Sequence, residues 1–466
     1  MKKSVFPLLI RAASILVIIA ALLPARTAAA QSDGAYYTVQ EGESLTMIAR
    51  YFHTSTNSLL TLNYLPNPDV LSPGKTLLIP GFEDLSGEII RSSFPAGETV
   101  STLNRSLRQG DDVITRLNFL TAPDALCIGQ RFFMLQAEDI EQTRIPLTSG
   151  ISSLELAVQT GTNPWLAAGY NNLRGPWDLL QNDTIFLPGT RTVPSSAGLL
   201  SFTNLSVNPS PLQQGKTTVV QVEAPQEAAL SGSLMGFPLH FFPDSGGSYT
   251  ALQGVPRLAS PGLVEIVLTS STADGRSFSL QQNLLLETVD YGFDSPLQVS
   301  DDTVDPEVTE PELQWLAEIT ADAPPEKMWY SSFQSPAPKE NNITSYYGRL
   351  RSYNGSPYDY YHSGLDYAGN ETTPVLAVAP GIVVFAGELT VRGNATIISH
   401  GWGVYTGYWH QSRIDVKVGD KVQVGQQIGL VGRTGRVTGP HLHYDLIVGS
   451  VEVDPEDWFT SVYAGF

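Results

Sequence analysis

The sequence is poor in cysteine and in basic residues, and each shortage excludes a class of structure or partner. Cys127 is the only cysteine among 466 residues, so no disulfide can form within the chain. A small buried apolar side chain is the role we expect for it. Lysine and arginine total 27 against 46 acidic residues, which gives a formal net charge of −19. Such a chain repels phosphate polymers, so we expect no nucleic-acid partner.

Long apolar runs are also scarce, and the one that stands out lies at the beginning of the sequence. Lys2 and Lys3 precede a largely apolar run over 12–23, and small residues follow at 28–30. This pattern predicts a secretory signal peptide over residues 1–30, with an uncleaved membrane anchor as the alternative. We expect a secreted or extracytoplasmic protein, in a cell wall or periplasm, without stable membrane insertion after cleavage. The sequence indicates no particular oligomeric state.

Glycine and proline are plentiful, whereas helix-length periodic segments are few. The chain has 41 glycines and 32 prolines, and short runs of Val, Ile, Leu and Tyr recur between turn signals. This alternation of short apolar runs and turn residues is typical of β-strands, and a chain of 466 residues is long enough for several domains. We therefore predict a multidomain, mainly β protein.

An internal repeat follows the predicted signal peptide. Three glycines each stand 21 residues before an asparagine and 32 residues before a second residue type that tolerates a left-handed backbone. The three sets are Gly42, Asn63 and Gly74; Gly97, Asn118 and Gly129; and Gly150, Asn171 and Asn182. Each copy predicts strand, helix, helix, strand, because an alternating stretch is followed by a helix-capping residue such as Ser44.

The first copy, residues 36–81, is similar to the lysin motif (LysM). The similarity is carried by the stretch from Tyr37 to Leu45 and by Ile79-Pro80-Gly81. It implies a small βααβ domain that binds glycan containing N-acetylglucosamine. The copies at 89–135 and 145–189 keep the spacing but are diverged, so they either bind glycan or retain only the fold.

Two segments without obvious chemistry follow the repeats. Strand runs over 217–222, 263–269 and 278–288, separated by glycine-containing turns, predict an antiparallel, Ig-like β-sandwich over 200–296 that serves as a spacer. His240 lies in an apolar stretch there, and we expect it in the core. Residues 297–335 predict an acidic linker with a short helix.

Five of the seven histidines lie beyond residue 361, which places candidate metal chemistry in the last domain, 336–466. His362 and Asp366 are four residues apart, and His441 and His443 fall on one face of a predicted strand. Together with His410 they suggest a metal site with an acid/base pair. For His400, at a strand end, we expect a structural role.

The sequence around these residues resembles the lysostaphin-type zinc endopeptidases, which are peptidoglycan hydrolases. The similar blocks include Tyr346 to Arg349, His362 to Asp366, Tyr408 to Ser412 and Gly432 to His443. The resemblance covers about 341–459 and implies an antiparallel β-sheet peptidase domain with one zinc ion. It implies three zinc ligands and two catalytic histidines. The ligands are His362, Asp366 and His443, and the catalytic residues are His410 and His441.

The sequence thus supports a secreted zinc-dependent endopeptidase that hydrolyses peptide bonds in peptidoglycan stems or crosslinks and reaches glycan through LysM. Three protein ligands leave one position open on a tetrahedral zinc, which is the catalytic arrangement. The alternative is a non-catalytic, wall-bound activator of a separate amidase. Such proteins usually lack zinc ligands, whereas all five histidine and aspartate positions are filled here.

Overall fold

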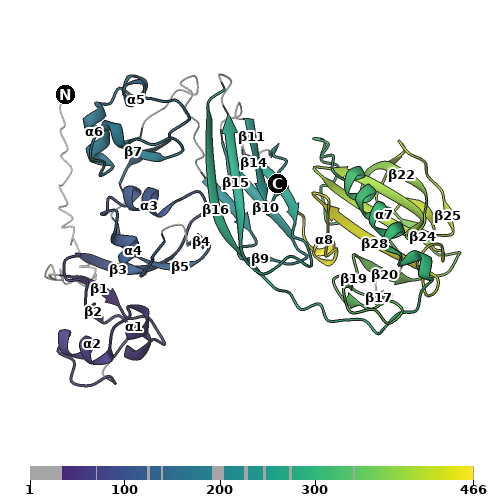
Figure 1. The fold of residues 1–466 in the computed structure, drawn as a ribbon, viewed down its shortest axis with the longest axis horizontal. Coiled ribbons are helices and arrows are strands. Elements are labelled where there is room, and N and C mark those ends of the chain that lie inside the picture. Colours follow the sequence, from purple (N-terminus) through teal and green to yellow (C-terminus); the bar gives the residue numbers. More distant parts are fainter. Residues whose placement is uncertain are drawn as a thin grey trace, which may run out of the picture. The chain divides into compact units, whose positions relative to one another are not determined.

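The computed structural model describes residues 34–69, 71–122, 126–137, 140–190, 204–224, 229–244, 248–271, 275–338 and 342–464. The predicted signal peptide lies outside these residues. The chain forms two compact units, Met1–Ile89 and Ile90–Phe466. Among the helices of the described ranges, none is both long and apolar enough to span a bilayer. The prediction of a mainly β chain with several antiparallel sheets is confirmed (Figure 1).

The first unit has the βααβ order that the first sequence copy predicts. Ser44 and Ser55 cap its two helices, each side chain accepting a backbone N–H three residues ahead. Leu45, Ile48 and Leu59 are buried beneath those helices. The elements are β1 (Ala35–Thr38), α1 (Leu45–Tyr51), α2 (Thr56–Leu62), β2 (Thr76–Leu78) and the start of β3 (Gly87–Ser93).

The second unit begins with two further copies of this arrangement. The second copy contains the rest of β3, α3 (Val100–Ser106), α4 (Val113–Leu117), β4 (Cys127–Ile128) and β5 (Arg131–Leu135). The third contains β6 (Gln142–Pro146), α5 (Ser153–Thr160), α6 (Pro164–Tyr170), a 3₁₀ turn (Pro176–Asp178) and β7 (Thr184–Pro188).

The repeated asparagine has the same structural role in every copy. Its side chain both accepts from and donates to the backbone of a residue 15 positions later, and so joins the second helix to the last strand. The pairs are Asn63 with Leu78, Asn118 with Phe133, and Asn171 with Phe186. Because one asparagine side chain pairs with both the N–H and the C=O of a strand residue, it holds the end of the second helix against the last strand in every copy.

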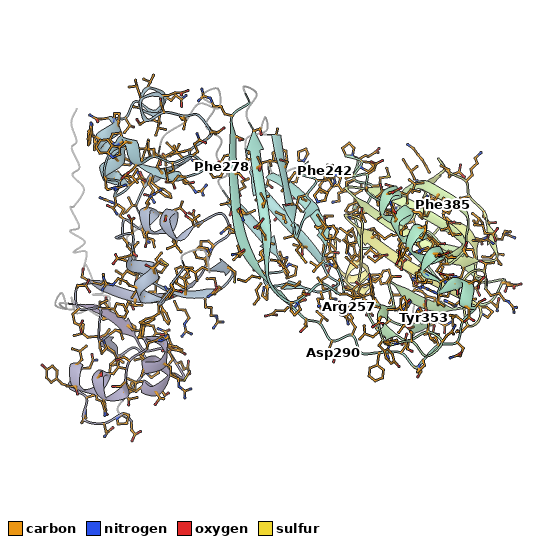
Figure 2. All side chains as sticks on the ribbon, viewed as in Figure 1. Phe242, Arg257, Phe278, Asp290, Tyr353 and Phe385 are labelled. Carbon is orange, nitrogen blue, oxygen red and sulfur yellow. The ribbon has the colours of Figure 1, made fainter. Side chains whose placement is uncertain are left out.

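Two packed sheets follow, with orders β13-β14-β10-β8 and β12-β11-β15-β16-β4. Phe278, labelled in Figure 2, is 1% exposed in the core between them. β4, which carries the buried Cys127, joins the second sheet parallel to β16. The elements are β8 (Asn204–Asn208), β9 (Leu212–Gln213), β10 (Thr217–Glu223), β11 (Ala229–Leu234), β12 (Phe237–Pro238), β13 (Phe242–Pro243), β14 (Ser248–Gly254), β15 (Gly262–Ser271) and β16 (Ser277–Glu287).

The prediction that His240 lies in the core is wrong. Its side chain is exposed, while the neighbouring Leu239 is buried. An apolar stretch at a sheet edge buries only part of its side chains, and His240 falls on the outer side.

The acidic segment that follows is packed against the last domain. A 3₁₀ turn (Asp301–Thr303) leads to α7 (Pro306–Ile319), which Asp305 caps. Leu316 is 3% exposed in a cluster with Ile397 and Tyr405 of the neighbouring sheet. Trp315 packs edge-on against Phe385 at 4.7 Å between ring centroids. The outer face of α7 keeps most of the acidic residues.

The last domain is built on a sheet of order β17-β20-β28-β24-β23-β22-β26, with β29 beside β28. Its core includes Tyr367, Tyr408, Leu442 and Tyr444, all at most 2% exposed. The elements are β17 (Ile343–Ser345), β18 (Leu350–Arg351), β19 (Tyr360–Tyr361), β20 (Leu365–Ala368), β21 (Pro374–Leu376), β22 (Gly381–Leu389), β23 (Gly393–Gly401), β24 (Val404–Gln411), β25 (Arg413–Ile414), β26 (Lys421–Val422), β27 (Gln427–Leu430), β28 (His441–Val448), β29 (Val451–Val453) and α8 (Glu456–Thr460).

Candidate metal centre

The five residues singled out from the sequence meet in one groove of about 430 Å³. His362 follows β19, Asp366 lies in β20, His410 lies in β24, and His441 and His443 lie in β28. β20 and β28 are antiparallel neighbours, and their register places Asp366 directly opposite His443. Directly opposed residues have their Cβ atoms about 5 Å apart, so the sheet itself brings these two side chains into contact.

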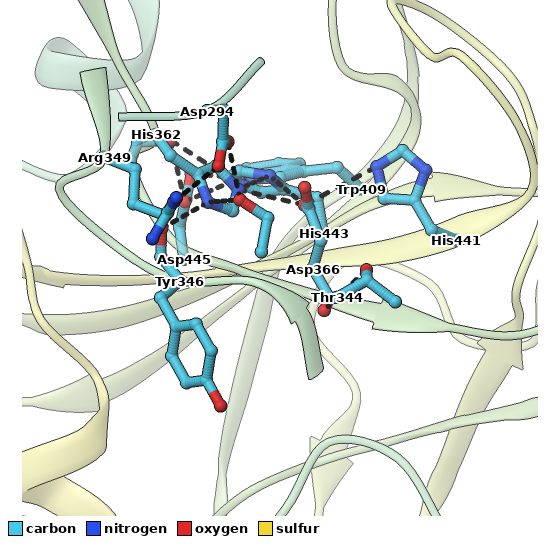
Figure 3. A network of polar contacts seen from close by, with 12 residues as sticks. Asp294, Thr344, Tyr346, Arg349, His362, Asp366, Trp409, His441, His443 and Asp445 are labelled. Carbon is cyan, nitrogen blue, oxygen red and sulfur yellow. Dashed lines mark hydrogen bonds and ion pairs between the residues drawn. The ribbon is translucent and has the colours of Figure 1, made fainter. Parts of the chain in front are cut away.

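Three side-chain atoms converge to a point in this groove (Figure 3). His362 Nε2 lies 3.0 Å from Asp366 Oδ1 and 3.0 Å from His443 Nδ1, and His443 Nδ1 lies 2.9 Å from Asp366 Oδ1. All three residues are buried and could hold a metal ion. Two imidazole nitrogens and one carboxylate oxygen are donors that a borderline-soft divalent metal accepts.

Hydrogen bonds on the far side of each ring decide which nitrogen faces the convergence point. His362 Nδ1 donates to the carbonyl of Tyr346 at 2.8 Å. His443 Nε2 donates to Asp445 Oδ1 at 2.6 Å. Because carbonyl and carboxylate oxygens only accept, each outer nitrogen carries a proton, and the inner nitrogens are the ones that can give a lone pair to a metal.

Asp445 is the least exposed charged residue of the site, at 0%. Besides His443 it accepts from Trp409 Nε1 at 2.7 Å and from Ser363 Oγ at 2.9 Å. Burial raises the pKa of Asp445, but the charges of His443 and Arg392 and the hydrogen bonds from His443 and Trp409 outweigh burial and lower the pKa to about 2. A carboxylate therefore stands behind His443 at all physiological pH values.

The remaining oxygen of Asp366 is held by an arginine. Arg351 Nη2 donates to Asp366 Oδ2 at 2.8 Å, and Arg351 Nε donates to Asp294 Oδ2 at 3.0 Å. Asp294 precedes the family-like region and also binds Arg349 at 2.5 Å. This chain of ion pairs fixes the carboxylate so that Oδ1 faces the two imidazoles.

The loop that carries His362 passes unusually close to β28. A Cβ atom on Gly364 would lie 2.0 Å from the carbonyl oxygen of Tyr444. Only glycine permits this approach, which places His362 within reach of His443.

The other two histidines form a pair beside the convergence point. Their ring centroids lie 4.9 Å apart. His410 Nδ1 donates to the carbonyl of Thr434 and His441 Nδ1 donates to that of Gly439, each at 2.8 Å. In each ring the proton is therefore on Nδ1, and Nε2 can accept a proton. Burial, and then the charges of His441 and His443, hold the pKa of His410 well below its usual range.

A local irregularity directs His410 into the groove. Its φ is +63°, in the left-handed region that non-glycine residues seldom adopt. The pairing of β23 with β24 shifts register between Asn394 and Thr396, opposite this residue. Bulges of this kind re-aim a side chain and are common next to active sites.

His400 lies outside this groove and its hydrogen bonds are satisfied within the core. Its Nδ1 donates to the carbonyl of Pro380 at 2.7 Å, and Nε2 accepts from Thr406 Oγ1 at 2.8 Å. Burial lowers its pKa to about 4, so the ring is neutral in the folded protein. These contacts suit the structural role expected for it.

The sequence reasoning missed Asp445, Ser363, Arg351 and Asp294. Asp445 could have been found, because it continues the alternation of His441 and His443 along one strand face. No sequence pattern connects Asp294 to the site, since it is 72 residues away from Asp366 and outside the family-like blocks.

Comparison with known proteins identifies two parts of the chain. Residues 360–455 match the model of peptidase family M23, and residues 37–80 match the LysM domain. The peptidoglycan DD-endopeptidase ShyA of Vibrio cholerae serotype O1 is 52% identical over 87 residues, which are 19% of this chain and 20% of that protein. The DD-carboxypeptidase/endopeptidase Mpg of Neisseria meningitidis serogroup B is 46% identical over 94 residues, or 20% of this chain and 22% of that protein.

The similarity to these curated relatives is local, because the chain spans about a fifth of their length. Among solved structures, a putative peptidase M23 from Pseudomonas aeruginosa is 24% identical, with 55% of this chain and 97% of that chain covered and a TM-score of 0.42. Both resemblances stated from the sequence are confirmed. The chain therefore carries a LysM domain at residues 37–80 and a peptidase family M23 domain at residues 360–455.

Proposed function

We propose that this chain is a zinc-dependent endopeptidase that hydrolyses peptide bonds in peptidoglycan stems or crosslinks, outside the cytoplasmic membrane. The observation that carries the proposal is the convergence of three ligand atoms beside two imidazoles whose Nδ1 atoms are held by backbone carbonyls. The names of the two relatives, both endopeptidases, favour a bond between D-amino acids. The LysM domain would hold the enzyme on glycan and so raise its local concentration at the substrate.

The three residues proposed as ligands suit zinc. His362 Nε2, Asp366 Oδ1 and His443 Nδ1 are 2.9–3.0 Å apart. The donors of a tetrahedral zinc site with bonds of about 2.0–2.2 Å are separated by about 3.3–3.5 Å, so each side chain would have to move outward by only a few tenths of an ångström. Three ligands leave one coordination position facing the groove.

When bound, zinc would supply Lewis acidity, which polarises the scissile carbonyl and makes water a stronger acid. His410 and His441 supply the proton transfers. A neutral imidazole with a free Nε2 accepts the proton of the attacking water and later donates it to the leaving amine. The second imidazole of the pair can stabilise the charge that develops on the carbonyl oxygen when its Nε2 carries a proton, because only the protonated nitrogen donates a hydrogen bond.

The test is hydrolysis of intact peptidoglycan by the full chain, with and without a chelator, followed by mass analysis of released fragments. Peptide-cleaved fragments that disappear with chelator and return with zinc would support the proposal and identify the bond. The His441→Ala variant should retain zinc and lose hydrolysis. His240→Ala is the matched control, because that histidine is exposed and lies outside the groove.

Zinc binding without release of fragments from any wall type would favour the alternative, a wall-bound activator of a separate amidase. In that case His441→Ala should leave the partner amidase's stimulated activity unchanged. Filled ligand positions and a complete histidine pair favour the enzyme.

A further inference from the structure

Three arginines line the groove, and two of them are neutralised by carboxylates. Arg351 donates to Asp366 at 2.8 Å, and Arg392 donates to Glu312 at 3.0 Å. The third, Arg436, has no acidic side chain paired with it among the described residues. Carboxylates are plentiful in this chain, which has 19 more acidic than basic residues, so the missing partner of Arg436 does not reflect an acid-poor composition.

Most of the hydrogen-bonding capacity of Arg436 is unused. A guanidinium has five N–H donors, and in the described part of the chain this one makes a single hydrogen bond, from Nη1 to the carbonyl of Thr303 at 3.2 Å. The guanidinium lies over the ring of Tyr353, whose centroid is 4.7 Å from Cζ. An aromatic ring in this position holds the guanidinium in place and leaves its remaining N–H donors available to a ligand.

The surroundings of Arg436 favour an additional negative charge. Burial lowers the pKa of Arg436, and the positive charges of Arg392 and Arg351 lower it further, although Tyr353 acts in the opposite direction. A partly buried cation without a counter-charge is costly, and proteins keep such a group where a ligand supplies the missing anion.

We propose that Arg436 binds a carboxylate of the peptide substrate and thereby selects acidic peptides at the groove. This inference rests on the proposed function for the nature of the ligand, a peptide. The planar fork of arginine matches a carboxylate with two parallel hydrogen bonds, which gives geometric selection as well as charge. Arg436 lies in the loop that leads to β28, and both Arg436 and His441 line the same groove.

The test compares two forms of one probe, a crosslinked peptide dimer of the diaminopimelate type with its side carboxylates free or amidated. Binding of the single tetrapeptide in both forms is measured by calorimetry, and kcat and KM are measured on the dimers. The full chain should bind the free form about tenfold to a hundredfold more tightly than the amidated form. Arg436→Gln should remove this preference by raising KM for the free form only.

Matched variants separate recognition from folding. Arg413→Gln removes a surface charge that is paired with Asp415, so it should keep the full preference. Arg436→Lys keeps the positive charge but not the planar guanidinium, so it should show a reduced preference for the free carboxylate. If thermal denaturation shows that Arg436→Gln is unfolded, the lysine variant takes its place in the comparison. Equal binding of both forms by the full chain, or a preference that survives in Arg436→Gln, would overturn the inference. Arg436-dependent binding without any hydrolysis would instead refute only the proposed function.

Discussion

Replacing Asp445 by asparagine should weaken metal binding although this residue is not one of the proposed ligands. Its two oxygens accept from different donors, Oδ1 from His443 and Oδ2 from Trp409. An asparagine of the same shape has only one acceptor oxygen, so one of these donors must face an NH₂ group. If the NH₂ group faces His443, the ring proton moves from Nε2 to Nδ1, the nitrogen that faces the metal position.

The size of the effect follows from the role of Asp445 as an orienting group. Loss of such a partner behind a metal-binding histidine typically costs about 10- to 100-fold in metal affinity, or about 1.4–2.7 kcal/mol. The buried position supports this range, because no water can replace the carboxylate at 0% exposure. The fold should persist, since the substitution conserves volume.

The assay is competition for zinc between the full chain and a chromophoric chelator at pH 7. Asp445→Asn should raise the dissociation constant by the stated factor. Asp415→Asn is the control, because Asp415 forms an exposed ion pair with Arg413. If Asp445→Asn bound zinc within twofold of the unmodified chain, the reasoning about the proton on His443 would be refuted.

Three further measurements test other parts of the structure. His400 has its pKa lowered to about 4, so its contribution to stability is complete above pH 6.5 and is lost as pH falls to about 4. Between these two pH values the metal-free chain should therefore lose about 3 kcal/mol more free energy of unfolding than the His400→Asn variant, as measured by urea denaturation. Leu316→Ala should cost about 2–5 kcal/mol, whereas Leu313→Ala on the same helix, 49% exposed, should cost little, and equal costs would contradict the packing of α7. His443→Ala should lose both bound zinc and hydrolysis, and metal analysis that finds full zinc content in this variant would exclude it as a ligand.

Strand alternation explains why much of the site could be anticipated. His441 and His443 are two residues apart, and any strand that contains them directs both to one side. The repeat glycines were likewise informative, since Gly42, Gly97 and Gly150 all have positive φ in the structure. Both patterns are local, so they hold whatever surrounds them.

The remainder depends on geometry that no local pattern encodes. His410 enters the groove through a bulge and a left-handed backbone, which is the product of strand pairing rather than of its own sequence. The acidic run over 301–312 indicated solvent exposure, yet one turn of the same helix directs Glu312 and Leu316 inward. A charge count averages over the two faces of a helix, whereas packing depends on each face separately.

Because the acidic segment with α7 packs against the last domain, it must be included in any fragment that is to fold with an intact groove. A fragment cut at residue 360, where the match to the peptidase family begins, would lack Glu312, which accepts two backbone N–H groups and the guanidinium of Arg392. It would also lack Arg351, which holds Asp366, and Asp294, the counter-charge of Arg351. A hybrid protein that borrows the groove should therefore begin no later than Gly292, whose carbonyl pairs with the amide of Leu350. The structural unit that supports the groove is therefore longer than the segment 360–455, which matches the family model.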